Sequence, residues 1–204
     1  MVGFHDIIKS ARDIPLTTRV PRLPLSFHNF TLILERGRPV SKRVLVGSDR
    51  FPAIDEAENL GYETNILERV QKVKSPRKKK VTNGNKSHDQ SSESETNAMS
   101  QLQRWVEQAV DEIVHLKMLE SIVDTAQPST IVLATGDAAE AEYSGGFMKM
   151  VERALEKGWR VELVSFSSTA SRAYSRKDFR AKWSSRFVII KLDEYAEYLL
   201  DMHA

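Results

Sequence analysis

Three acidic residues follow an apolar segment in the second half of the chain, and their types and spacing are the best placed to do chemistry. Residues 130–134 read Thr-Ile-Val-Leu-Ala, and a Thr-Gly-Asp turn then brings Asp137, with Glu140 and Glu142 shortly after it. Such an apolar run is typical of a strand buried on both faces. The carboxyl ends of strands form the ligand crevice of an open α/β sheet, and crowded carboxylates favour a hard cation such as Mg²⁺ or Mn²⁺. The pattern therefore predicts a divalent-cation site at this strand end.

The same residues also fit a structural role. Asp137 and Glu140 have the D-x-x-E spacing of a capping box, in which both acids accept hydrogen bonds from N–H groups at the start of a helix. The two interpretations are compatible if Glu140 caps the helix while Asp137 binds metal. The spacing alone leaves both open.

Composition limits the classes of protein to consider. A chain of 204 residues with 41% hydrophobic content predicts one sizeable globular domain. The absence of cysteine excludes disulfides, thiolate zinc sites and cysteine nucleophiles. No apolar run approaches the roughly 20 residues of a membrane span, so we expect an intracellular protein without a membrane partner. The net charge of +2 means that any preference for nucleic acid must come from local patches.

The elements that must position the acids follow an α/β pattern. A helix is predicted over residues 25–35, and a strand, a helix and a second strand are predicted over residues 42–48, 52–60 and 62–70. A strand, a short helix and a strand at this spacing form a βαβ unit with parallel strands and a right-handed crossover. The fold class is therefore predicted to be α/β.

The second half continues the pattern. Residues 101–125 have the apolar periodicity of a long helix, and its row of Glu107, Asp111 and His115 is expected to be a solvated face from which Asp111 could reach the crevice. Further predicted elements are a helix at 143–157, a strand at 159–166 whose alternation indicates an outer position, a last strand at 187–192 and a closing helix at 193–202. We expect one sheet of at least five strands.

Two segments are rich in basic residues. Residues 72–100 have too few apolar side chains to fold, so we predict a disordered insert. Its basic run at 77–80 is either a nuclear-import signal or an RNA contact, or it is simply solvated. The compartment is therefore expected to be the nucleus or the cytoplasm. Residues 167–186 interleave arginines and lysines with aromatic residues. We expect Tyr174, Phe179 and Trp183 to be less important for RNA than the basic residues around them, with Phe179 and Trp183 facing the core. The candidate RNA-binding residues are Arg172, Arg176, Lys177 and Arg180.

Several runs together resemble one family. The run T-I-V-L-A-T-G-D-A-A-E-A-E-Y-S-G-G-F, followed by V-E-R-A-L-E-K-G-W-R-V-E-L-V-S-F, is similar to the carboxyl half of an NYN domain, most closely in its fungal branch. The upstream runs R-V-L-V-G-S-D and V-D-E-I-V-H-L-K-M-L-E-S-I resemble the same branch. The resemblance implies a PIN-like, Rossmann-like three-layer sandwich. It divides the chain into half-domains at 1–71 and 101–204 around the insert at 72–100.

The resemblance also implies a site and a function. Asp137 takes the place of the family's S/T-G-D aspartate and Asp111 that of the aspartate opening the preceding helix, while Ala139 replaces a further acid for which Glu140 or Glu142 would substitute. These residues would hold Mg²⁺ or Mn²⁺ in a ribonuclease, a hydrolase acting on single-stranded RNA. The family's first strand, which ends in an aspartate followed closely by an asparagine, has no counterpart before Phe4, so we expect a domain lacking that strand and weak or absent activity.

The alternative class is a non-catalytic RNA-binding or scaffold module with the same fold. Binding of Mn²⁺ separates the two, because only a nuclease needs the metal site. A homodimer or other protein partners remain open at this level.

Overall fold

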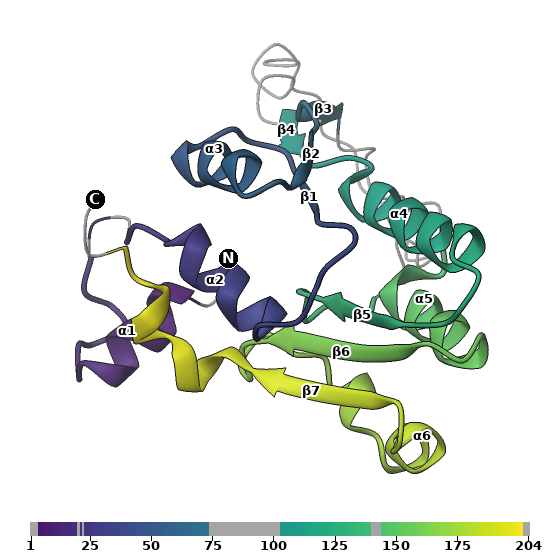
Figure 1. Ribbon diagram of the computed structural model, residues 1–204. Helices are drawn as coiled ribbons and strands as arrows, with labels where there is room; N and C mark the ends of the chain where they lie inside the picture. The colour runs from purple at the N-terminus through teal and green to yellow at the C-terminus, as the bar shows by residue number, and fades with distance from the viewer. Residues whose placement is uncertain (1–3, 20, 22, 74–102, 140–143, 202–204) are drawn as a thin grey trace, which may run out of the picture.

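A computed structural model describes residues 4–19, 21, 23–73, 103–139 and 144–201 of the chain (Figure 1). Its largest sheet is parallel, in the order β5-β6-β7, and a second parallel pair is formed by β1 and β2. The helix α3 (Pro52–Asn59) connects the strands of that pair, as the βαβ prediction requires. The predicted α/β class is thus confirmed. The strands are β1 (Val44–Gly47), β2 (Glu63–Ile66), β5 (Thr130–Leu133), β6 (Arg160–Ser165) and β7 (Phe187–Lys191).

Helices cover both faces of the three-stranded sheet. One hydrophobic core joins it to α4, α5 and α6, and the other joins it to α1, α2, α3 and the last turns of the chain. The helix bounds are α1 (Phe4–Ala11), α2 (Phe27–Glu35), α4 (Val110–Asp124), α5 (Gly146–Glu156) and α6 (Lys177–Trp183), with 3₁₀ turns η1 (Arg172–Ser175), η2 (Leu192–Tyr195) and η3 (Glu197–Leu199). None of the helices in the described part of the chain has the length and apolar character that a membrane crossing requires.

The strand β6 lies at the centre of its sheet, so the predicted outer position was wrong. Val161 and Leu163 are fully buried on one face, and Val164 is buried on the other. The polar alternation that indicated an outer strand comes partly from Glu162, whose side chain is only 7% exposed. This carboxylate accepts hydrogen bonds from Arg36 and from Arg38, the latter at 3.0 and 2.8 Å. Ion pairing allows a charged residue to lie inside a central strand.

The strand β5, predicted to be buried on both faces, does pack against both cores, with Ile131 and Leu133 on one and Val132 on the other, but it lies at the edge of its sheet. Only Leu133 among its residues is fully buried. The expected single sheet of five strands is divided among the described residues into the β1–β2 pair and the β5-β6-β7 sheet. The predicted closing helix is also absent, since the 3₁₀ turns η2 and η3 take its place.

A hairpin that the sequence did not predict interrupts the long helix expected from residue 101. The strands β3 (Val70–Val73) and β4 (Gln103–Val106) pair in antiparallel fashion, and α4 begins only at Val110, after Ala109 with a left-handed φ of 62°. The helix buries Met118, while the apolar residues Leu116 and Val123 of the predicted helix are 49% and 78% exposed. The predicted insert and its basic run lie mostly outside the described residues.

We expect Glu162→Gln to destabilise the fold by about 2–3 kcal/mol, because it removes the carboxylate that the guanidinium groups of Arg36, Arg38 and Arg160 share. Burial alone would raise the pKa of Glu162, but hydrogen bonding and charge from Arg38 and Arg36 outweigh it and lower the pKa. A lowered pKa stabilises the folded state above the ordinary carboxyl range, and this stabilisation is lost as the pH falls.

Urea unfolding of both proteins over a pH series measures this difference. Glu197→Gln is the matched control, because Glu197 pairs with Arg12 at the surface, where an ion pair contributes about 0–1 kcal/mol. An equal loss of stability in both variants would show that the Glu162 cluster has no special role.

Candidate metal centre

The two acids that the sequence singled out, Asp111 and Asp137, line the same cavity. Asp111 stands in the first turn of α4, and Asp137 follows the carboxyl end of β5. The two acids are 26 residues apart in the sequence, and the packing of α4 brings both to this cavity. Their position at the carboxyl end of a parallel strand is where α/β proteins bind ligands.

The surroundings of Asp111 disfavour its charged form. Partial burial raises the pKa of Asp111, and the negative charge of Asp137 raises it further. His115, one helical turn along α4, has the opposite effect on the pKa of Asp111. Ionising Asp111 in this position costs free energy, and a bound cation would lower that cost.

The turn that carries Asp137 is fixed by hydrogen bonds at three points. The Asp137 Oδ1 atom accepts a hydrogen bond from the Ala139 N–H at 2.8 Å, and the Asp137 N–H donates to Thr135 Oγ1 at 3.2 Å. The buried hydroxyl of Tyr174 donates to the Asp137 carbonyl at 2.7 Å. Tyr174 is therefore a positioning residue, which its place among basic residues in the sequence did not reveal.

Among the described residues Asp137 begins no helix, because Ala138 and Ala139 are not helical and α5 begins at Gly146 with Gly145 as its N-cap. Asp137 instead closes a local turn onto Ala139. Glu140 and Glu142, the other predicted ligands, lie outside the described residues. Within the described ranges, no group of three potential ligands from histidine, aspartate and glutamate gathers to hold a metal.

Gly136 is required by close contact between two loops. A Cβ atom at this position would lie 2.5 Å from the Thr169 carbonyl oxygen, and the Gly136 carbonyl accepts a hydrogen bond from Ser171 N–H at 2.7 Å. The Thr-Gly-Asp turn therefore packs directly on the loop after β6. This contact explains why a glycine precedes Asp137.

The expected solvated row of Glu107, Asp111 and His115 does not form. Glu107 precedes α4 and accepts a hydrogen bond from Ser48 Oγ at 2.6 Å. His115 is only 3% exposed; its ring lies 4.4 Å from that of Phe147 and its Nδ1 is 2.9 Å from Ser144 Oγ. Burial lowers the pKa of His115, which favours the neutral ring.

The predicted RNA-binding residues lie on η1, on α6 and at Arg176 between them, after the loop that contacts Gly136. Their four side chains are exposed, whereas Tyr174, Phe179 and Trp183 are buried, as expected for Phe179 and Trp183. Arg176 forms an ion pair with Asp178 at 2.7 Å. Because Tyr174 also reaches Asp137, the basic segment begins beside the acidic turn. The four residues are Arg172, Arg176, Lys177 and Arg180.

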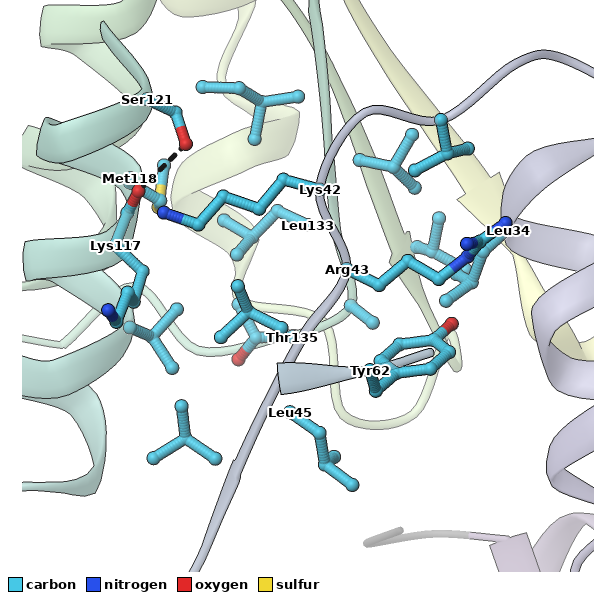
Figure 2. A pocket seen from close by; sticks show the side chains of 18 of the residues that line it. Leu34, Lys42, Arg43, Leu45, Tyr62, Lys117, Met118, Ser121, Leu133 and Thr135 are labelled. Atoms are coloured by element: carbon cyan, nitrogen blue, oxygen red, sulfur yellow. Dashed lines mark hydrogen bonds between the residues drawn. The ribbon is translucent and has the colours of Figure 1, made fainter. Parts of the chain in front are cut away.

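The cavity that Asp111 and Asp137 border has a volume of about 1300 Å³ and extends between the two parallel sheets. Figure 2 shows Leu45 of β1 and Leu133 of β5 between Met118 of α4 on one side and Leu34 of α2 on the other. Apolar side chains line its middle. Charged residues also line it, among them Lys42, Arg43 and Lys117 as well as the acids Asp111 and Asp137.

Comparisons with known proteins provide no family for this chain. No protein-family model matches it, and no curated protein does. Its structure is similar to the crystal structure of a protein of unknown function from Vibrio parahaemolyticus, with 13% sequence identity and a TM-score of 0.43, over 93% of this chain and 90% of that one. A similarity at this level supports no inference about function.

We expect Gly136→Ala to destabilise the protein by about 1–3 kcal/mol, because the added methyl group must displace the backbone at Thr169. Gly47→Ala is the matched control, since its Cβ would meet only the end of the Ile66 side chain at 3.8 Å. Thermal unfolding measures both. Equal melting temperatures would mean that the two loops separate easily.

We expect Asp111→Asn to raise the stability of the metal-free protein at neutral pH. A carboxyl group whose pKa is raised in the folded state opposes folding above its unfolded pKa, and the opposition disappears as the pH falls below that value. Thermal unfolding at neutral and acidic pH tests this sign. A variant less stable than the wild type at neutral pH would show that Asp111 supports the fold instead.

Proposed function

We propose that Asp111 and Asp137 form the protein part of a divalent-cation site that hydrolyses RNA phosphodiester bonds, as the resemblance to the NYN branch of the PIN-like nucleases implies. The proposal depends on one observation above all. Two carboxylates from different elements, one on α4 and one after β5, interact electrostatically at the carboxyl end of a parallel strand.

The donor atoms fit the proposed cation. Mg²⁺ and Mn²⁺ prefer carboxylate oxygens, and both acids supply them. A bound cation would neutralise the negative charge that develops on the phosphate and would lower the pKa of a bound water molecule. The raised pKa of Asp111 supports the assignment, because a cation would offset both the burial and the like charge that raise it.

The chain's own residues have separate roles in this proposal. Asp111 and Asp137 supply the carboxylates, and Tyr174 holds the backbone of Asp137 in place. The exposed side chains of Arg172, Lys177 and Arg180 would bind the phosphates of single-stranded RNA that passes from α6 towards the acids. RNA binding and hydrolysis would then occur along one continuous surface.

A second candidate is an RNA-binding module without catalysis. It is favoured by the finding that two acids, and no group of three potential ligands, come together in the described ranges. Hard cations bind weakly to sites with few charged oxygen ligands. In this case the basic residues of η1 and α6 would still bind RNA.

We expect Asp137→Asn to abolish Mn²⁺-dependent cleavage of single-stranded RNA while changing stability little, because an asparagine oxygen can still accept the hydrogen bond from Ala139. Asp55→Asn is the control, since this acid is exposed on α3 and pairs with Arg50. Gel assays of cleavage and calorimetry with Mn²⁺ make the comparison. Equal cleavage by the wild type and Asp137→Asn would show that Asp137 does not bind the catalytic metal.

The double substitution Arg172→Ala and Lys177→Ala should weaken binding of single-stranded RNA and reduce its dependence on salt, because fewer phosphates are neutralised. Fluorescence anisotropy over a salt series measures both effects. If the protein is a nuclease, the double variant loses RNA cleavage together with RNA binding. If it is a binding module, the wild type binds RNA but does not cleave it. Unchanged RNA affinity would exclude this surface from either function.

A further inference from the structure

Two parallel strands face the large cavity with edges that have no strand partner in the described part of the chain. The strand β1 pairs only with β2, and β5 pairs only with β6. In Figure 1 the β1–β2 pair lies above β5, with α2 to the left and α4 to the right. The cavity is lined by every residue of β5 and by Val44, Leu45 and Val46 of β1.

Hydrogen bonding shows which residues point into this space. The carbonyls of Arg43 and Gly47 accept hydrogen bonds from Glu63 and Leu67, on the β2 side. Because successive residues of a strand direct their backbone groups to opposite edges, Val44 and Val46 point away from β2.

The same reasoning applies on the other side of the cavity. The carbonyl of Ser129 accepts a hydrogen bond from Arg160 of β6, so Thr130 and Val132 point away from β6. Two rows of backbone donors and acceptors therefore border the cavity.

The helices that form the walls of the cavity are also compatible with a bound strand. Val114 and Met118 of α4 line one wall, and Phe30 and Leu34 of α2 line the other. A strand between them would bury alternate side chains against each helix, so it must be apolar on both faces. The charged residues that also line the cavity favour polar ends.

We propose that this cavity, which we call the strand slot, binds a single extended peptide segment that completes one continuous parallel sheet from β2 to β7. The segment is apolar on both faces over about four to six residues, matching the short strands that border it. It forms backbone hydrogen bonds with Val44 and Val46 on one side and with Thr130 and Val132 on the other.

The occupant is a peptide segment that belongs to no other sheet. A strand in the slot uses both of its edges, whereas each strand of the described chain already uses one edge to pair with a neighbour. A second copy of the chain could fill the slot with one of these strands only by breaking its own sheet. A lone segment has no such cost.

A peptide titration tests the proposal directly. The probe is a short fluorescent peptide with a centre of valine and isoleucine and with charged ends, added to the 204-residue chain. Two further peptides carry backbone N-methyl groups on one or the other set of alternate central residues, which removes the donors from one edge only. Because the slot pairs with both edges, either modification should weaken binding by about tenfold or more.

Substitutions in the chain locate the binding. Proline at Val46 removes a donor on the slot side and leaves the β1–β2 ladder intact, because that ladder uses the alternate residues. Val46→Pro should therefore weaken peptide binding by about tenfold relative to Val46→Ala, which also shortens the side chain but keeps the backbone N–H. The two variants should unfold at similar temperatures without peptide.

The outcomes decide between occupants. Loss of affinity with both N-methylated peptides and with Val46→Pro supports the slot. Tolerance of one methylation pattern means that the peptide adds to a single exposed edge and overturns the proposal. Absence of peptide binding overturns it too, as does sedimentation showing a dimer that Val46→Pro dissociates.

Discussion

The parallel ladder that joins β5, β6 and β7 is the interaction on which the rest of the structure depends. Both hydrophobic cores pack against this sheet, and β6 contributes buried side chains to each of them. Helices of this length are marginal in water by themselves, so they form because an apolar face is buried on the sheet. Loss of the ladder would therefore expose both cores together.

The sheet also determines where chemistry can occur. Its carboxyl edge presents the Thr-Gly-Asp turn, and the loop after β6 holds that turn through Gly136 and Tyr174. The helix α4 then adds Asp111 from outside the sheet. An acidic pair built in this way is held by packing and not by proximity in sequence, which is why its geometry can persist although its charges repel each other.

Sequence patterns predicted the elements better than their partners. Apolar periodicity located β1, α3, β6 and α5 within a few residues, because each has a buried face with a regular repeat. The order of strands was harder, since a residue such as Glu162 appears exposed in the sequence although distant arginines make its burial possible. The helix start at Val110 was missed because pairing of β4 with β3, a contact between distant segments, outweighed the helical periodicity around Trp105.

The candidate site was predictable only in part for the same reason. Asp137 follows an apolar strand, and that local signal identifies it. The tether from Tyr174 and the burial of His115 against Phe147 depend on contacts between segments far apart in the chain, for which one sequence has no signal.

The β3–β4 hairpin has a consequence for the evolution of the chain's length. Val73 and Gln103 are paired Cα partners, so two residues 30 positions apart in the sequence are held at neighbouring points. The entropy of closing a loop between fixed ends rises only slowly with the number of residues. Material of very different length can therefore be inserted or removed between these partners at little thermodynamic cost, which makes the hairpin a natural junction for acquiring a new domain.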